Sequence, residues 1–167
     1  MGDQQADFKN AMRRLAATVG IISAGGPDTQ AERHGITATA ITSLSMDPPA
    51  LLVCINRSGS FHPLMLRNGH FCVNLLRSAQ AGVSNAFAGK LAPADRFLHG
   101  EWDEDELGVP FLRDAQANIF CTRQETVEYG SHSIFIGAVR HVALADEINP
   151  LLFVNGAYGQ YAPLALD

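Results

Sequence analysis

Two long apolar segments separated by only two residues constrain the fold of this chain more than any other feature. They run from 115 to 129 and from 132 to 144, with Gly130-Ser131 between them. Every residue from Ile134 to Val139 is apolar, which is typical of a strand whose two faces are both buried. A two-residue connection joins antiparallel neighbours. The pattern therefore predicts a long antiparallel β-hairpin.

Shorter apolar runs, most of them bounded by glycine or proline, account for much of the remaining chain. We expect strands at 19–24, 35–49, 50–55, 70–76 and 151–155, and helices at 7–18, 60–69 and 79–88. Ser60 is the expected N-cap of the second helix, and Gly89 the residue that ends the third. The first two strands are expected to form a hairpin, and Pro48 and Pro49 to break pairing.

Residues 91–110 have the composition of a loop, and we expect the acidic run at 101–106 to face solvent. The chain shows no internal repeat and no regular alternation of strands with helices. We therefore expect one domain over residues 1–167, mainly β with added helices, in which a closed or partly closed antiparallel barrel forms the body.

Composition excludes several classes of function. The net charge is -5 and the basic residues are scattered, so we expect no nucleic-acid partner and no anionic membrane surface. No apolar run is long enough to span a bilayer, and Met1–Gln5 is polar without a signal core. We therefore expect a cytoplasmic protein. Its three cysteines, which lie in apolar runs, are expected to be buried free thiols.

The sequence lacks the common motifs of nucleotide, metal and hydrolase chemistry. It contains no Gly-x-Gly-x-x-Gly fingerprint, no P-loop and no Gly-x-Ser-x-Gly elbow. Its six histidines and three cysteines show no metal-ligand spacing, so we expect no metal site.

Small polar segments remain as candidate binding residues. Residues 35–49 alternate hydroxyl and small apolar side chains, which would let a flat ligand approach the backbone closely. Asn56–Ser60 leads into an expected helix and could bind a phosphate, while Phe87–Lys90 ends another. The same features also fit an ordinary exposed strand and a helix cap.

Five segments occur in the order of a known family. They are 35–49, 52–58, 69–76, 130–139 and 150–153 followed by Tyr158-Gly159. With these segments, residues 8–161 resemble the short-chain flavin reductases, which are the reductase components of two-component flavin-dependent monooxygenases.

The resemblance implies a split β-barrel of Greek-key type, FMN or FAD as cofactor, NADH or NADPH as hydride donor, and a homodimer. It implies an NAD(P)H:flavin oxidoreductase whose reduced flavin diffuses to a partner monooxygenase. By motif position, Thr39, Ala40, Ile41, Thr42 and Ser43 would line the flavin ring. Ser45, Asn56, Ser58 and Ser60 would hold its polar edge, ribityl chain or phosphate. Phe87, Ala88, Gly89 and Lys90 would reach toward the phosphate or adenosine, and Tyr158 would also contact the cofactor.

His132 matches the histidine of the family's Gly-Asp-His motif and is the expected catalytic residue near the nicotinamide. Two positions depart from the family pattern. Ser131 replaces the acidic residue before that histidine, and Asn155–Ala157 replaces a segment in which arginine is common. Because a 2′-phosphate favours a guanidinium partner, the second departure favours NADH over NADPH. A flavin-binding barrel without turnover and a flavin-retaining oxidase of a small molecule remain as alternatives.

Overall fold

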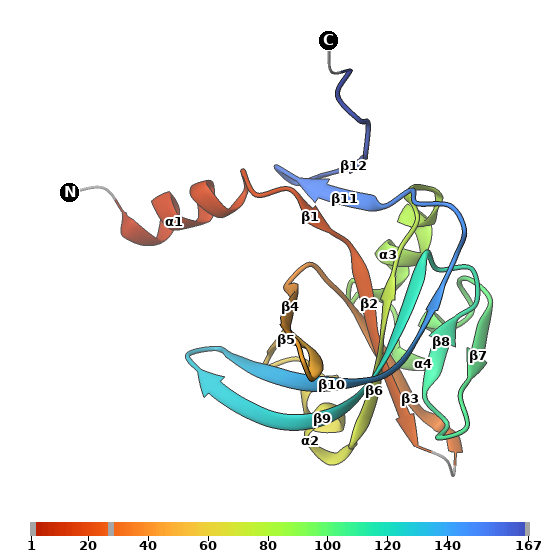
Figure 1. The fold of residues 1–167 in the computed structure, drawn as a ribbon. Helices are drawn as coiled ribbons and strands as arrows, with labels where there is room; N and C mark the ends of the chain where they lie inside the picture. Colours follow the sequence, from red (N-terminus) through yellow and green to blue (C-terminus); the bar gives the residue numbers. More distant parts are fainter. Residues whose placement is uncertain (1–2, 27–28, 166–167) are drawn as a thin grey trace.

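The structure is a computed structural model that describes residues 3–26 and 29–165. Figure 1 shows a curled β-sheet with short helices packed against one side and one helix standing apart at the N-terminus. In chain order the elements are α1 (Gln4–Met12), β1 (Ala17–Thr18), β2 (Gly20–Gly26), β3 (Thr29–Ala38), β4 (Ile41–Met46), β5 (Pro49–Asn56), α2 (His62–Arg67), β6 (His70–Leu75), η1 (Ser78–Gln80), α3 (Ala81–Phe87), α4 (Pro93–Arg96), β7 (Trp102–Glu104), β8 (Pro110–Leu112), β9 (Ala117–Tyr129), β10 (His132–Leu144), β11 (Leu151–Val154) and β12 (Ala157–Gln160).

A seven-stranded sheet forms the body, in the order β3-β2-β6-β9-β10-β5-β4 with antiparallel pairing throughout. Two smaller sheets, β1-β11-β12 and β7-β8, lie outside it. The mainly β, antiparallel architecture confirms the expected fold class. In the part of the chain that is described, no helix has the length and apolar character that crossing a bilayer requires.

The long hairpin predicted from the sequence is present as β9 and β10, each 13 residues long. Register shifts after Ile136 and after Val139 interrupt its ladder, and irregularities of this kind increase strand twist and bending. Gly137 occupies the crowded inner face. A Cβ there would lie 2.5 Å from Phe71 Cζ and 2.8 Å from Cys121 Cβ, so this bend of the strand packs against the core without a side chain.

Alternation along β5 places Leu51, Val53 and Ile55 on the buried face of the sheet. They pack with Phe71 of β6 and Phe135 of β10 in the main core. Because residues of one strand alternate between its two faces, a short apolar run can bury every second side chain in this way.

A second core lies under the short helices. Phe87 at the end of α3, Phe97 and Trp102 form a cluster of three rings with centroids about 5 Å apart, and it packs with Val19 and Leu151. This core ties the helical side of the molecule to β11.

Some predicted boundaries are wrong. The first helix ends at Met12 rather than at Thr18, and none of its residues is buried. Residues 35–49 do not form one strand, because β3 ends at Ala38 and β4 begins at Ile41. Pro49 does not break pairing; it begins β5 and lies opposite Met46. Proline is accepted at the first residue of a strand, where a ladder donor is not required.

The helix after Ser60 begins one residue later than expected. Phe61 is its N-cap and provides no side-chain hydrogen bond, while the Ser60 hydroxyl lies against a histidine instead. Residues 91–110 also hold more structure than a loop, since they contain α4 and β7. Gly89 follows α3 with a φ of 97°, as expected of a residue that ends a helix.

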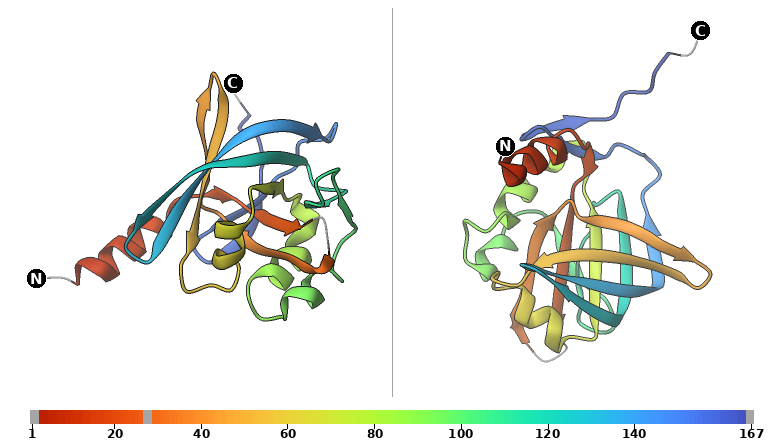
Figure 2. Two further views of the ribbon diagram at one scale, coloured as in Figure 1. Left: turned by 90° about the horizontal axis from the view of Figure 1, so that it is seen from below. Right: turned by 90° about the vertical axis from the view of Figure 1, so that its left-hand side faces the viewer.

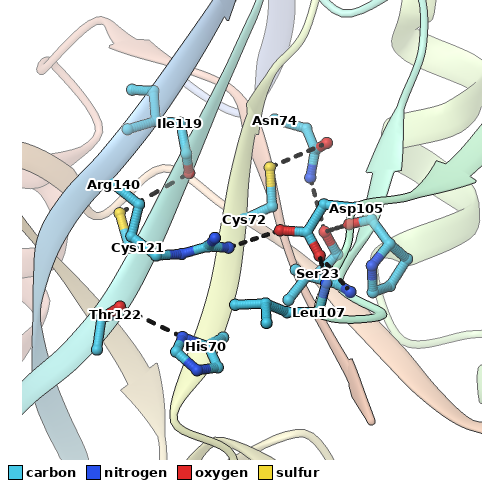
Figure 3. Close-up of polar contacts among 12 residues, drawn as sticks. Ser23, His70, Cys72, Asn74, Asp105, Leu107, Ile119, Cys121, Thr122 and Arg140 are labelled. Atoms are coloured by element: carbon cyan, nitrogen blue, oxygen red, sulfur yellow. Dashed lines mark hydrogen bonds and ion pairs between the residues drawn. The ribbon is translucent and has the colours of Figure 1, made fainter. Parts of the chain in front are cut away.

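The acidic run is only partly solvated. The Asp105 side chain is 6% exposed and accepts a hydrogen bond from Arg140 Nη2 at 2.6 Å (Figure 3). Its other oxygen accepts from the backbone N–H groups of Leu107 and Val109, both at 2.9 Å. Burial alone would raise the pKa of Asp105, but these hydrogen bonds outweigh it and hold the pKa below its usual value.

The cysteines are free thiols, two of them buried and Cys54 half-buried. Cys72 lies beside Asn74, which also donates to Ser23 of β2 (Figure 3). The Asn74 amide joins β2 and β8 to β6 through a buried network. Burial raises the pKa of Cys121 to about 12, so neither its burial nor its ionisation suits a nucleophile.

Candidate functional site

A cavity of about 550 Å³ opens where the ends of β3 and β5 meet α3 and the β11–β12 hairpin. Its apolar wall consists of Val19, Ile36, Ile55, Phe61, Phe87 and Phe153, and its polar wall of Thr37, Thr39, Asn56, Ser60, Ser84, Arg96 and Tyr158. The small residues Ala38, Gly59, Ala88 and Gly89 complete it. A mixed wall and a volume within the range of about 300–1,000 Å³ suit a small organic ligand.

A chain of hydrogen bonds holds the hydroxyl side of the cavity in place. Thr37 Oγ1 donates to the Ser84 carbonyl oxygen at 2.6 Å. Ser84 Oγ and Tyr158 OH are 2.9 Å apart, and the Tyr158 hydroxyl donates to Asn85 Oδ1 at 3.0 Å. These contacts connect β3, α3 and β12. Thr37, Ser84 and Tyr158 therefore line the cavity and also hold the β11–β12 hairpin against α3.

The turn after β5 is organised by Asn56. Its Oδ1 accepts from the backbone N–H and from the hydroxyl of Ser58, both at 2.9 Å. The oxygen is therefore already in use, and the side-chain NH₂ remains as the group that can donate to a ligand. Ser58 faces Asn56 rather than the cavity.

Two buried basic side chains belong to this region, Arg96 in the polar wall and His34 behind it. His34 is 7% exposed, and its Nε2 lies 2.9 Å from Ser60 Oγ. Arg96 is 4% exposed and donates from Nη1 to the Gly35 carbonyl oxygen at 2.7 Å and from Nε to that of Leu91 at 3.0 Å. Burial and the nearby Arg96 charge lower the pKa of His34, so its ring is neutral at neutral pH.

A second cavity of about 660 Å³ adjoins the first, with Thr39 and Phe153 in the walls of both. Its other lining residues include Ala40 and the α1 side chains Phe8 and Met12. The two cavities therefore form neighbouring compartments on either side of the chain segment that follows β3.

The structure brings part of the predicted site together. The first cavity is lined by Thr39, Asn56, Ser60, Phe87, Ala88, Gly89 and Tyr158, and Ala40 lines the second. Among the predicted residues that the structure describes, Ile41, Thr42, Ser43, Ser45, Ser58, Lys90 and His132 line neither. The first four belong to β4, an edge strand whose sheet partner is β5, because the chain turns at Thr39 and Ala40 instead of continuing along the cavity.

His132 lies beside the first cavity rather than in its wall. It begins β10, opposite Asn56 in the antiparallel register, and directly opposed residues project to the same face of a sheet. Its side chain is exposed, and its Nδ1 lies 2.9 Å from Ser131 Oγ. A ligand reaching out of the cavity past Asn56 would therefore approach this imidazole.

Sequence reasoning missed His34, Phe61, Ser84, Arg96 and Phe153. Four of them line the first cavity, and His34 contacts a residue that does. A lone histidine in a strand and an arginine in a loop-like segment carry no local signal. They become site residues only because β3, α3 and α4 pack against one another.

The sequence of this chain is similar to those of known flavin reductases. Residues 12–162 match the family model described as flavin reductase like domain. The reductase component of the FADH(2)-dependent resorcinol hydroxylase of Rhizobium sp. (strain MTP-10005) is 42% identical over 161 residues, which is 96% of this chain and 89% of that protein. The FMN reductase (NADH) RutF of Stutzerimonas stutzeri is 40% identical over 152 residues, covering 91% and 86%.

Solved structures show the same architecture. The NADH:FAD oxidoreductase SgcE6 of Streptomyces globisporus, determined in complex with NAD and FAD fragments, superposes with a TM-score of 0.88 at 25% identity and covers 98% of this chain and 97% of that one. BorF, the flavin reductase component of a bacterial two-component tryptophan halogenase, gives a TM-score of 0.85 at 26% identity and covers 96% and 100%. The family match over most of the chain, with relatives at 40% and 42% identity, shows that the chain belongs to the flavin reductase like domain family.

Proposed function

We propose that this protein is an NADH-dependent flavin reductase that supplies reduced flavin to a partner monooxygenase. The observation that carries the proposal is the cavity between β3, β5 and α3 in a chain of the flavin reductase family. The similar proteins include an NADH-dependent FMN reductase and a reductase component of a hydroxylase, so NADH and FMN or FAD are the expected substrates.

The cavity has the surfaces that a flavin needs. Phe61, Phe87 and Phe153 provide aromatic and apolar area for a planar ring. Thr39, Asn56 and Ser60 supply hydroxyl and amide groups, which match the polar edge and ribityl chain of a flavin. The Tyr158 hydroxyl is already held by hydrogen bonds with Ser84 and Asn85, so its position is set before a ligand binds.

We propose that the other cofactor contacts implied by the family resemblance lie at the edges of the same site. Ala40 faces the second cavity, and Ile41, Thr42, Ser43 and Ser45 follow on β4. Ala88 and Gly89 line the first cavity, with Lys90 after them. In this arrangement Ser58 acts through Asn56, whose Oδ1 it occupies.

When flavin and nicotinamide are both bound, a hydride passes from the nicotinamide to the flavin ring. The contribution of this chain is to position the two rings. His132 lies beside the cavity mouth with one ring nitrogen held by Ser131, so the other can bind a carboxamide. Asn56 can donate to a ligand from the same edge of the sheet.

The test is steady-state oxidation of NADH by the purified protein with FMN, FAD or riboflavin as acceptor. We expect NADH oxidation to depend on added flavin. We also expect flavin reduction to be faster with NADH as the donor than with NADPH. Tight flavin binding without NADH turnover would contradict the proposal and favour a flavin-binding protein. Retention of flavin through many turnovers, with a different small molecule oxidised, would indicate an oxidase.

Replacing His132 tests its role separately. We expect His132→Ala to lower the hydride-transfer rate by about 10²-fold, the lower end of the range for a lost catalytic side chain, with a much smaller change in flavin affinity. Stopped-flow measurement of flavin bleaching gives the rate, and equilibrium titration gives the affinity. His141→Ala is the matched control, because His141 is an exposed histidine further along β10, stacked on Phe120. An unchanged rate in His132→Ala would make it an ordinary surface residue.

The protein is proposed to act as a cytoplasmic homodimer of one domain per chain. The apolar side chains on α1 support the dimer, since Phe8 is 66% and Met12 47% exposed in the protomer. Reduced flavin is proposed to reach the monooxygenase by diffusion, so no lasting contact with the partner is required.

A further inference from the structure

The β11–β12 hairpin lies over the first cavity but has few partners in the sheets. Two of its residues, Phe153 and Tyr158, line that cavity. Among the described strands, β12 pairs only with β11, and β11 pairs in addition with β1, which is two residues long. A two-stranded ribbon is only marginally stable by itself. The position of the hairpin therefore depends on side-chain contacts outside the sheet.

The tip of the hairpin is formed by Asn155 and Gly156. Their φ angles are 51° and 82°, and two positive values at the central residues are those of a type I′ turn, which an Asn-Gly pair favours. A Cβ on Gly156 would lie 3.1 Å from Arg13 Nη2. The guanidinium of Arg13 therefore passes close over this turn.

Arg13 is the C-cap residue of α1, and Figure 1 shows this end of the helix beside the hairpin. The Asn155 N–H donates to the Arg13 carbonyl oxygen at 2.8 Å. In return, Arg13 Nε donates to Asn155 Oδ1 at 3.3 Å and Nη2 donates to the Asn155 carbonyl oxygen at 3.2 Å. Arg13 forms no ion pair with any residue that the structure describes. Its guanidinium thus serves to hold the hairpin tip.

A second attachment holds the hairpin through β12. The Tyr158 hydroxyl contacts Ser84 and Asn85 of α3. Phe153 lies opposite Tyr158 in the hairpin, with the two ring centroids 5.4 Å apart, and it lines both cavities. The Phe153 ring is therefore part of the wall between the two compartments, and its position follows that of the hairpin.

We propose that Arg13 is a positioning residue for the flavin. By holding the hairpin tip, it keeps Phe153 and Tyr158 over the cavity and so sets how long the flavin stays bound. The proposal rests on the proposed reductase function, in which reduced flavin must leave after every turnover. Both side-chain contacts of Arg13 are exposed and go to neutral oxygens, so water can replace them at little cost. Such an attachment can order the hairpin and still open for release.

The experiment measures the rate at which FMN leaves the protein, from the recovery of flavin fluorescence after rapid dilution. We expect Arg13→Gln to raise this dissociation rate by about threefold to tenfold, the effect of a lost hydrogen bond. The rate of flavin bleaching in a single turnover, at saturating flavin and NADH, should not change, because Arg13 lines the second cavity and not the first.

Arg14→Gln is the matched control for the loss of positive charge. Arg14 follows Arg13 at the end of α1, and its side chain donates to the Asn10 carbonyl oxygen of the same helix. This variant should keep the wild-type dissociation rate. Equal increases in Arg13→Gln and Arg14→Gln would mean that only the charge matters, and would contradict the proposal.

A change at Asn155 should shift the rate in the opposite direction. Asn155→Asp keeps the turn, because an Asp-Gly pair also favours type I′, and it places a carboxylate against the Arg13 guanidinium. We expect flavin release to slow by about twofold, the effect of an exposed ion pair. The slowing should disappear when Asn155→Asp is combined with Arg13→Gln. An arginine with a merely structural role would not slow release when its contact is strengthened. Unchanged dissociation rates in both single variants would overturn the proposal.

Failure of the reductase function gives a different result. Hydrogen exchange of the backbone amides in the β11–β12 hairpin reports on the attachment without flavin or NADH. We expect faster exchange in Arg13→Gln than in the wild type and Arg14→Gln, even if NADH oxidation does not depend on flavin. Equal exchange in all three proteins would refute the attachment itself, whatever the protein does with NADH.

Discussion

At the scale of single residues, the environment of His34 controls its charge. Burial and the adjacent Arg96 lower its pKa from the ordinary value of 6.5. Its contacts with Gly35 and Ser60 are those of a neutral ring. The same side chain in an unfolded chain would be protonated once the pH falls below that value, so folding and proton uptake at His34 oppose each other.

The pH dependence of stability follows from this difference. Between the lowered pKa of folded His34 and 6.5, the unfolded state binds more protons than the folded state, so the free energy of unfolding decreases as the pH falls. Urea unfolding at a series of pH values should show a smaller decrease for His34→Gln than for the wild type. Identical pH slopes for the two proteins would contradict a neutral His34.

At the scale of elements, Asp105 fastens the β7–β8 ribbon to β10. It accepts from two backbone N–H groups of its own turn and from Arg140 (Figure 3). Asp103, two residues earlier, pairs with Arg113 on the surface, where both side chains are about half exposed. The two aspartates of one acidic run therefore differ in burial, although their sequence context is almost the same.

Replacing each aspartate by asparagine measures that difference. Asp105→Asn leaves Arg140 partly buried without its counter-charge, and Arg140 Nε is already buried without a hydrogen bond. We expect a loss of about 3 kcal/mol in the free energy of unfolding, the size typical of breaking a buried pair. Asp103→Asn should change stability much less, because solvent screens an exposed pair. Equal losses of unfolding free energy for the two variants in chemical denaturation would contradict this role of the Asp105–Arg140 pair.

At the scale of the whole molecule, α1 and the tip of the β9–β10 hairpin project from the same side of the barrel (Figures 1 and 2). No α1 residue is buried, and Tyr129 at the hairpin tip is 84% exposed. Large exposed apolar patches mark interaction surfaces. This side of the protomer is where the proposed homodimer would form.

A charge placed on this surface should separate the protomers. We expect Phe8→Glu to shift the protein from dimer to monomer in sedimentation velocity, because the carboxylate would be buried without a partner. Leu98→Glu is the control, since Leu98 is 78% exposed and comes two residues after α4, a helix that Figure 1 shows away from α1. A wild-type monomer, or a Phe8→Glu dimer, would contradict this interface.

Local periodicity was enough to predict the long hairpin, a strand at 50–55 and the antiparallel class, although only alternate residues of that strand are buried. Those features depend on the pattern of apolar residues within one segment. That pattern can be recognised without knowing what packs against the segment. Segment ends were predicted less well. The chain leaves β3 after Ala38, and α1 stops at Met12, because packing partners rather than propensity decide where a strand or helix stops.

The five ordered segments in the sequence were also enough to predict the family and, from it, Thr39, Asn56, Ser60 and Tyr158 as candidate ligand contacts. Only the tertiary structure shows that His34 stands behind Ser60 and that Arg96 faces the same cavity. The physical reason is that polarity and charge at a site depend on which distant side chains burial brings together. Gly35 and Arg96 are 61 positions apart, and no local pattern encodes the hydrogen bond that joins them.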